Sequence, residues 1–160
     1  MTIETITPCL WFDKEAEEAA NYYISIFKKS KINYISHYGK EGFEIHRMPE
    51  GTVLAIGFEL NGQPFTAINA GPQFKFTEAV SFQIGCETQK EIDYYWEKLT
   101  ADGGEESMCG WLKDKYGLSW QVNATSEKMA KIMNDPKRSG KAMIALMQMR
   151  KLDLAALENA

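Results

Sequence analysis

Apolar and polar residues alternate with two different periods at the start of the chain. Residues 5–12 alternate as in a half-buried strand, with Leu10 and Phe12 on one face. In 13–28, alanines and aromatic residues recur at the spacing of a helix. Asp13 stands directly before this run, where a short carboxylate can cap a helix N-terminus. The pattern therefore predicts a strand followed by an amphipathic helix.

Three further strands are expected before residue 76. Their alternating runs lie at 31–38, 52–60 and 63–69, and Asn61-Gly62 between the last two is typical of a tight hairpin turn. The segment 39–51 is polar, contains glycines and a proline, and is predicted to be a loop.

The same order of elements begins again near residue 79. A strand at 79–87 places Phe82 and Ile84 on one face, and Thr88 with Glu91 has the spacing of a capping box at the start of the next helix. That helix is expected to stop at the glycines 103–104. The remaining predicted elements are strands at 106–114 and 118–122, then helical segments at 125–134, at 138–150 and from 153.

A shift of 72 residues brings the two halves into phase. Leu10 then falls on Phe82, Phe12 falls on Ile84, and "NYY" from 21 falls on "DYY" from 93. The preserved order indicates two copies of a βαβββ unit. We therefore predict a first module at 1–76, a second and shortened module at 77–124, and a C-terminal helical segment at 125–160.

Several stretches carry a closer resemblance, namely "PCLWFD" (8–13), "AEEAANYYISIF" (16–27), "FELNGQPFTAINAGPQFKF" (58–76), "AVSFQIGCETQKEIDYYWEKL" (79–99) and "GGEESMCGWLKDKYGLSWQV" (103–122). They resemble the PhnB-like branch of the vicinal oxygen chelate superfamily, a branch also called the 3-demethylubiquinone-9 3-methyltransferase family. The superfamily includes glyoxalase I, extradiol dioxygenases and fosfomycin-resistance proteins. The resemblance implies an α+β fold in which two modules form a cupped mixed sheet, with helices outside and a ligand on the inner face.

The resemblance also implies where a metal would be held. Metal enzymes of the superfamily draw ligands from inward positions on the first and last strands of each module. Those positions fall here on Thr7, Asn69, Ala79 and Gln121, and Gln121 stands where a glutamate is usual. On the strand at 63–69, Ala67 is the alternative to Asn69 as the inward residue. Neutral oxygens bind divalent transition metals weakly, and alanine offers no donor. We therefore expect neither a metal nor a cofactor.

The expected pocket is lined by polar and aromatic side chains. The amides would bind a ligand through hydrogen bonds, or they are satisfied internally and bind nothing. The tryptophan side chains would form aromatic walls of the pocket, or they would pack in the hydrophobic core or at a dimer interface. The cysteines favour core packing, since His37 and His46 lie far away in sequence. The candidates are Thr7, Cys9, Trp11, Asn69, Ser81, Gln83, Cys109, Trp111 and Gln121.

Three carboxylates near the second hairpin allow another interpretation. Glu105, Glu106 or Asp114 could act as a general base at the mouth of the cup, although a solvated rim is the commoner outcome. The functions left open are a metal-free small-molecule binder, a metal-dependent glyoxalase- or dioxygenase-type enzyme, a non-catalytic structural module, and a methyltransferase. The glycine-rich turn that common methyltransferases use for their cofactor is not found.

Charge and composition exclude some classes of binding partner. The 160 residues carry a net charge of −4, which argues against nucleic acid or an anionic membrane. No apolar run is long enough to span a bilayer, and the N-terminus does not resemble a signal peptide. Three cysteines without paired spacing favour a cytoplasmic protein with reduced thiols. The methionine-rich stretch 142–157 could close over the cup or contact a second subunit. Because related folds often assemble as dimers, the resemblance implies a homodimer.

Overall fold

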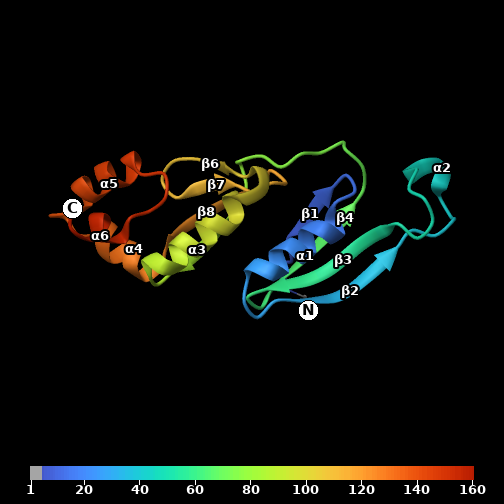
Figure 1. Ribbon diagram of the computed structural model, residues 1–160, viewed down its shortest axis with the longest axis horizontal. Coiled ribbons are helices and arrows are strands. Elements are labelled where there is room, and N and C mark those ends of the chain that lie inside the picture. Colours follow the sequence, from blue (N-terminus) through green and yellow to red (C-terminus); the bar gives the residue numbers. More distant parts are fainter. Residues whose placement is uncertain (1–4) are drawn as a thin grey trace. The chain divides into compact units, whose positions relative to one another are not determined.

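The computed structural model describes residues 5–160, which form two compact units with their boundary in the chain between Lys75 and Phe76 (Figure 1). Each unit is described by itself, as unit one and unit two. Both contain a four-stranded mixed sheet with a helix on one face.

Unit one has the first predicted βαβββ order. Its sheet has the strand order β1-β4-β3-β2, in which β1 and β4 are parallel and the other neighbours are antiparallel. The parallel pair is possible because a helix crosses between its strands. The elements are β1 (Cys9–Phe12), α1 (Ala16–Ile26), β2 (Lys31–His37), α2 (Phe43–His46), β3 (Val53–Leu60) and β4 (Gln63–Asn69).

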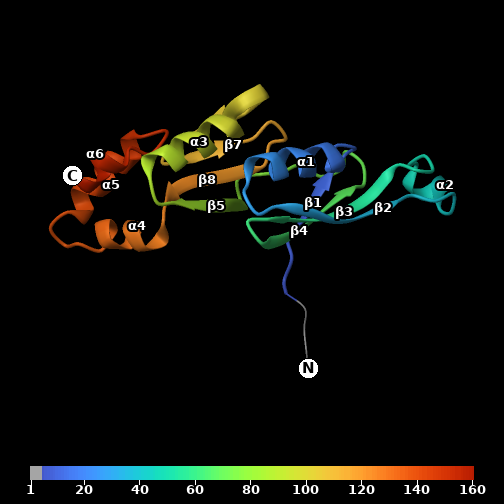
Figure 2. The ribbon, with the colours of Figure 1, turned by 60° about the horizontal axis from the view of Figure 1, so that its bottom comes forward.

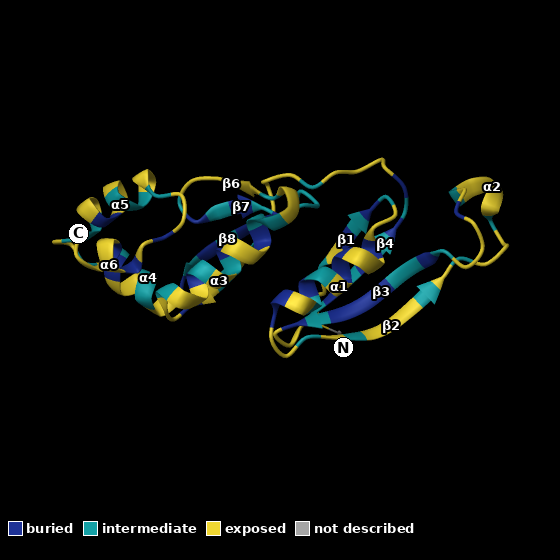
Figure 3. Ribbon diagram, viewed as in Figure 1, coloured by how far each residue is buried: buried dark blue, intermediate teal, exposed yellow. Residues whose placement is uncertain are grey.

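The core of unit one lies between α1 and its sheet. Leu10 and Phe12 are buried, and Tyr23 on α1 is fully covered. Buried and exposed turns alternate along α1 in Figure 3. The alternating pattern of the first strand and the helical spacing of the next segment are therefore confirmed. The hairpin at Asn61 and Gly62 is also confirmed, since both residues have positive φ as this turn requires.

Three local predictions for unit one are wrong. The strand begins at Cys9 rather than at residue 5, and α1 begins at Ala16 without a cap from the Asp13 side chain. The predicted loop contains the one-turn helix α2. There, His46 accepts from the Met48 backbone N–H through Nδ1 at 3.0 Å, with Nε2 lying 3.0 Å from the Glu41 carbonyl oxygen. These side-chain contacts stabilise a helical turn that the polar composition of the segment did not predict.

Unit two repeats the strand order as β5-β8-β7-β6, with β5 and β8 parallel. The predicted capping box is confirmed, because the Thr88 side chain accepts from the Glu91 backbone N–H while the Glu91 carboxylate accepts from the Thr88 N–H. The elements are β5 (Ser81–Cys86), α3 (Gln89–Thr100), the 3-10 turn η1 (Ala101–Gly103), β6 (Glu105–Glu106), β7 (Trp111–Lys113), β8 (Ser119–Ala124), α4 (Ser126–Met133), α5 (Ser139–Gln148) and α6 (Leu154–Glu158).

The single strand predicted at 106–114 is wrong. It is a hairpin of the short strands β6 and β7, and its turn passes through Cys109 (φ 59°) and Gly110 (φ 81°). A Cβ at Gly110 would lie only 2.8 Å from the Val122 carbonyl oxygen. Glycine is therefore required there for both its conformation and its size.

The predicted C-terminal helices are confirmed and are part of unit two. Figure 2 shows α4, α5 and α6 together beyond one end of the β5–β8 pair. The Cys109 and Gly110 amides donate to the carbonyls of Met149 and Arg150, both at 2.7 Å. Leu152 and Leu157 are fully buried. Among residues 5–160, no helix is long and apolar enough to cross a bilayer.

Candidate functional site

Unit two turns one face of its sheet toward α3 and leaves the other face, here called the open face, uncovered by that helix (Figure 2). On the α3 side, Phe82 pairs with Trp120 and their rings lie 5.6 Å apart. Side chains alternate across strands, so their neighbours point to the open face. The pairs on the open face are Ser81 with Ser119, Gln83 with Gln121, Trp111 with Gln121, Lys113 with Ser119, and Glu105 with Lys113.

Hydrogen bonds join the amides of this face into one network. Gln121 donates through Nε2 to Ser81 Oγ at 2.8 Å. The Gln121 Oε1 accepts from Gln83 Nε2 at 3.3 Å and from Asn123 Nδ2 at 3.4 Å. The structure thus brings together three predicted residues, Ser81, Gln83 and Gln121. Asn123 was missed, although its place two residues after Gln121 puts it on the same face.

The network keeps hydrogen-bonding capacity for a ligand. A primary amide has two donor hydrogens and two acceptor lone pairs. Gln121 uses both acceptor sites of Oε1 inside the network, whereas the Gln83 and Asn123 amides each contribute one donor to it. Gln83 is exposed, so a molecule on the open face can reach the groups that the network does not use.

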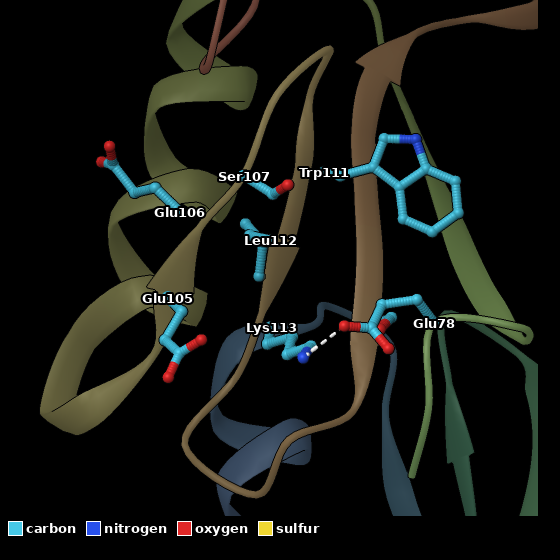
Figure 4. A pocket seen from close by; sticks show the side chains of 8 residues that line it. Glu78, Glu105, Glu106, Ser107, Trp111, Leu112 and Lys113 are labelled. Atoms are coloured by element: carbon cyan, nitrogen blue, oxygen red, sulfur yellow. Dashed lines mark ion pairs between the residues drawn. The ribbon is translucent and has the colours of Figure 1, made fainter.

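A pocket of about 180 Å³ lies on the β6–β7 side of unit two (Figure 4). Two of its lining residues, Trp111 and Ser119, pair across the strands with Gln121 and Ser81 of the network. Trp111 is half-buried in its wall, and no other described residue forms a hydrogen bond or ring contact with its indole. Three carboxylates, one lysine, two serine hydroxyls and one leucine complete the lining. The lining residues are Glu78, Glu105, Glu106, Ser107, Trp111, Leu112, Lys113 and Ser119.

Lys113 is the cation of this pocket. Its ammonium contacts the Glu78 carboxylate, and the two side chains point toward each other in Figure 4. This hydrogen-bonded pair holds the pKa of Glu78 below its usual value and raises the pKa of Lys113. The charge of Glu105 adds to the increase at Lys113. Both groups therefore stay ionised at neutral pH.

Ser119 has an unusual environment for a hydroxyl. The residue is 1% exposed, and its Oγ has no hydrogen-bond partner among the described residues. Buried hydroxyls are usually paired, since an unpaired one loses its hydration without compensation. Ser119 lies between Lys113 and Ser81 across the strands. The pocket therefore contains an unused hydrogen-bonding group.

The corresponding face of unit one is less polar. Cys9 pairs with Thr66 and Trp11 pairs with Ile68 across the parallel strands. The Trp11 indole donates to the Gly71 carbonyl oxygen at 2.8 Å, and the Phe74 ring meets it edge-on at 4.9 Å. The indole N–H is thus already satisfied within unit one, so Trp11 offers mainly an apolar surface.

The two candidate cysteines lie in different surroundings. Cys9 is exposed as a residue, yet partial burial still raises the pKa of its thiol. Cys109 sits in the β6–β7 turn, where its backbone N–H is held by Met149. The thiol of Cys9 is therefore protonated at neutral pH, which disfavours a nucleophilic role.

Asn69 does not point to the open face of unit one, so the sequence prediction for it is wrong. Its Oδ1 accepts from the Ala16 backbone N–H at 2.8 Å, and its Nδ2 donates to the Val53 carbonyl oxygen at 2.9 Å. The residue is 2% exposed, and Ala67, the alternative inward residue on this strand, is fully buried. Asn69 caps α1 and leaves the set of candidate ligand-binding residues.

The donors at the four expected ligand positions do not fit a metal ion. Asn69 is engaged in capping, and both acceptor sites of Gln121 Oε1 receive amide donors. Thr7 is exposed and lies before β1, and its hydroxyl donates a hydrogen bond to the Thr5 carbonyl oxygen. The Ala79 side chain has no atom that could bind a metal. Among residues 5–160, no group of three or more His, Cys, Asp or Glu side chains gathers to hold a metal.

The three carboxylates predicted near the second hairpin have different hydrogen-bond partners. Asp114 is 2% exposed, so the solvated rim expected for it is wrong. It accepts from the backbone N–H groups of Tyr116 and Leu118 and from Trp120 Nε1 at 2.8 Å. Glu106 accepts from Trp96 Nε1 at 2.8 Å. Asp114 fixes the β7–β8 turn, and Glu105 is the hairpin carboxylate left on the open face.

Comparison with known proteins identifies the fold and the family. The family model described as 3-demethylubiquinone-9 3-methyltransferase matches residues 4–123. A solved structure described as a putative 3-demethylubiquinone-9 3-methyltransferase, PhnB protein, from Bacillus cereus is 42% identical, with a TM-score of 0.66. The alignment covers 76% of this chain and 100% of that one.

More distant structures share the fold alone. A protein from Pseudomonas aeruginosa is 17% identical with a TM-score of 0.61, covering 77% of this chain and 98% of that one. The fosfomycin resistance protein FosX from Listeria monocytogenes, complexed with Mn(II) and sulfate, is 15% identical with a TM-score of 0.54, covering 84% and 98%. No curated protein matches the chain. The predicted glyoxalase-type α+β fold is confirmed.

Proposed function

The chain belongs to the 3-demethylubiquinone-9 3-methyltransferase family of the vicinal oxygen chelate superfamily, and we propose that it binds an organic small molecule without a metal ion. The observation that carries this proposal is the network of Ser81, Gln83, Gln121 and Asn123 on the open face of unit two. Its central residue occupies a position where the superfamily's metal enzymes carry a carboxylate.

The network is suited to polar recognition in the following way. Each amide is oriented by its neighbours before a ligand arrives, so little rotational freedom is lost on binding. Trp111, which pairs with Gln121 across β7 and β8, supplies an apolar wall beside these polar groups. A few convergent polar groups next to an aromatic surface are the usual composition of a small-molecule site. The ligand class is therefore a molecule with both an apolar body and a hydrogen-bonding group.

A fragment screen followed by nuclear magnetic resonance tests this proposal. Bound fragments are expected to shift the side-chain amide signals of Gln83, Gln121 and Asn123. Gln121→Leu should weaken binding about tenfold, because it removes the hydrogen bonds that orient the network. Gln148→Leu, at the exposed end of α5, is the matched control and should leave affinity unchanged. The proposal is wrong if no fragment shifts these signals, or if Gln121→Leu binds as the parent does.

A homodimer in the cytoplasm completes the proposal. Met143, Ile144 and Met147 on α5 are 47%, 62% and 63% exposed, which is unusual for large apolar side chains and supports a covered surface. Three free cysteines suit a reducing compartment. Light scattering of the purified chain tests the dimer, with Ile144→Glu expected to shift the mass toward the monomer. A monomeric parent chain would contradict the proposal.

A further inference from the structure

One end of the open face of unit two carries more negative than positive charge. Glu105 pairs with Lys113 across β6 and β7, and the Glu78 carboxylate contacts the same ammonium. Glu78 forms the ion pair with Lys113, and Glu105 is a second carboxylate on the neighbouring strand, which leaves an excess of one negative charge among these three groups. The hydrogen bond between the two side chains, with the attraction between their charges, lowers the pKa of Glu78 and raises the pKa of Lys113.

Trp111 provides an aromatic surface beside these charges. It lies two residues before Lys113 on β7, so both side chains are on the same face of the strand. The indole has no ring or hydrogen-bond contact with the other described residues. The face of an indole attracts cations through its quadrupole, and the attraction grows as the cation loses water.

The buried hydroxyl of Ser119 is a second, independent indication of a ligand. It lines the same pocket, it is directly opposite Lys113 across β7 and β8, and it has no hydrogen-bond partner within residues 5–160. A hydroxyl oxygen accepts readily from an N–H donor. The pocket therefore offers an ammonium group a carboxylate, a hydroxyl oxygen and an aromatic face.

We propose that this end of the site binds the primary ammonium group of a small organic molecule whose apolar body lies against Trp111. Glu105 and Glu78 supply the opposing charge, and Ser119 Oγ accepts one of the ammonium hydrogens. An anionic group is disfavoured because Lys113 is already neutralised by Glu78, and Glu105 repels a second anion. The inference rests on the proposed function, since it names the ligand class of the same open face.

Three probes of matched shape and different charge test the inference: benzylamine, benzyl alcohol and benzoate. Each is titrated at pH 7 into the full ¹⁵N-labelled chain, and the four indole N–H signals are followed. The Trp111 signal is assigned from its loss in Trp111→Phe. Benzylamine is expected to shift it and to bind roughly tenfold more tightly than benzyl alcohol, whereas benzoate should bind least.

Two variants separate the charge from the hydroxyl. Glu105→Gln should lower the affinity for benzylamine several-fold and leave the affinity for benzyl alcohol unchanged. Its matched control is Glu97→Gln on the exposed side of α3, which should affect neither probe. Ser119→Ala should also lower the affinity for benzylamine. It should not reduce the folding stability of the free protein, because the hydroxyl forms no hydrogen bond with the part of the chain that the structure describes.

The possible failures are distinguishable. Equal affinity for benzylamine and benzyl alcohol, tighter binding of benzoate, no binding of benzylamine, or binding that ignores Glu105→Gln would each overturn the charge preference. The proposed function survives all four if fragments of any charge still shift the amide signals of Gln121. The proposed function is wrong in a different case, namely when no small molecule shifts the amide signals of that network.

Discussion

Asn69 accepts the Ala16 backbone N–H at 2.8 Å, which joins the end of β4 to the first turn of α1. The first N–H groups of a helix have no partners within the helix. Here the partner comes from a strand 53 residues later in sequence, and the same side chain also donates to Val53. The side chain at the position that the resemblance aligns with a metal ligand therefore holds the crossover helix to its sheet.

Replacing this amide should destabilise the protein. Asn69→Ala leaves the Ala16 N–H and the Val53 carbonyl buried without partners, and we expect a loss of about 2–4 kcal/mol in the free energy of unfolding. Asn123→Ala, on the open face of unit two, should cost less than about 1 kcal/mol. Urea denaturation of both variants measures the difference. Similar costs for the two would show that Asn69 is not the structural amide described.

A second prediction concerns the buried carboxylate of the β7–β8 turn. Asp114→Ala removes the acceptor of two backbone N–H groups and of Trp120 Nε1, so the free energy of unfolding should fall by about 3 kcal/mol or more. Asp114→Asn keeps an acceptor for the backbone and should cost less. Urea denaturation checks the order, and an Asn variant as unstable as the Ala variant would contradict it.

The parity of each strand decided which sequence predictions held. Gln121 and Gln83 were placed correctly because Trp120 and Phe82, their large apolar neighbours, mark the α3 side. In β4 both Ala67 and Ile68 are apolar, so alternation alone does not identify the buried face. Burial of Phe65 and Ala67 puts Asn69 on the helix side.

Contacts distant in sequence explain the remaining errors. Met108 and Trp111 extend an apolar run that suggests one strand, but the Met149 and Arg150 carbonyls hold the intervening residues in a turn. Ser119 drew no attention, since nothing in a single sequence shows that a serine hydroxyl will be buried without a partner. Glu78 likewise became relevant only when folding placed it against Lys113.

Alkaline pH should destabilise the protein through Cys86. Burial, with the charge of Glu91 adding to it, raises the pKa of this thiol from 9.0 to about 12. Between these values the unfolded chain releases the proton while the folded chain keeps it. The unfolded state then binds fewer protons, so stability falls as pH rises, by at most about 1.4 kcal/mol per pH unit.

Urea denaturation at pH 8 and at pH 10.5 measures this effect. Cys86→Ala should be less stable than the parent at pH 8 because it leaves a small cavity, and the gap should narrow at pH 10.5. Cys9→Ala should change the pH dependence less, since Cys9 is exposed. A gap of constant size would show that the Cys86 thiol ionises alike in both states.

Restoring the carboxylate of the superfamily should not restore a metal site. In Gln121→Glu the new carboxylate has no companion donor at Ala79, and Asn69 remains occupied by α1. We expect no gain in affinity for zinc or manganese by calorimetry, together with weaker binding of fragments to the amide network. Tight binding of one metal per chain by this variant would mean that the other ligand positions were assigned incorrectly.

The central claim is that the site binds its ligand without a metal, and metal content tests it most directly. The untagged protein, purified without chelator, is challenged with zinc, nickel, manganese and iron, dialysed, and measured by elemental analysis. We predict close to zero metal per chain. Close to one firmly held metal per chain would contradict the claim and make a metal-dependent enzyme the leading interpretation.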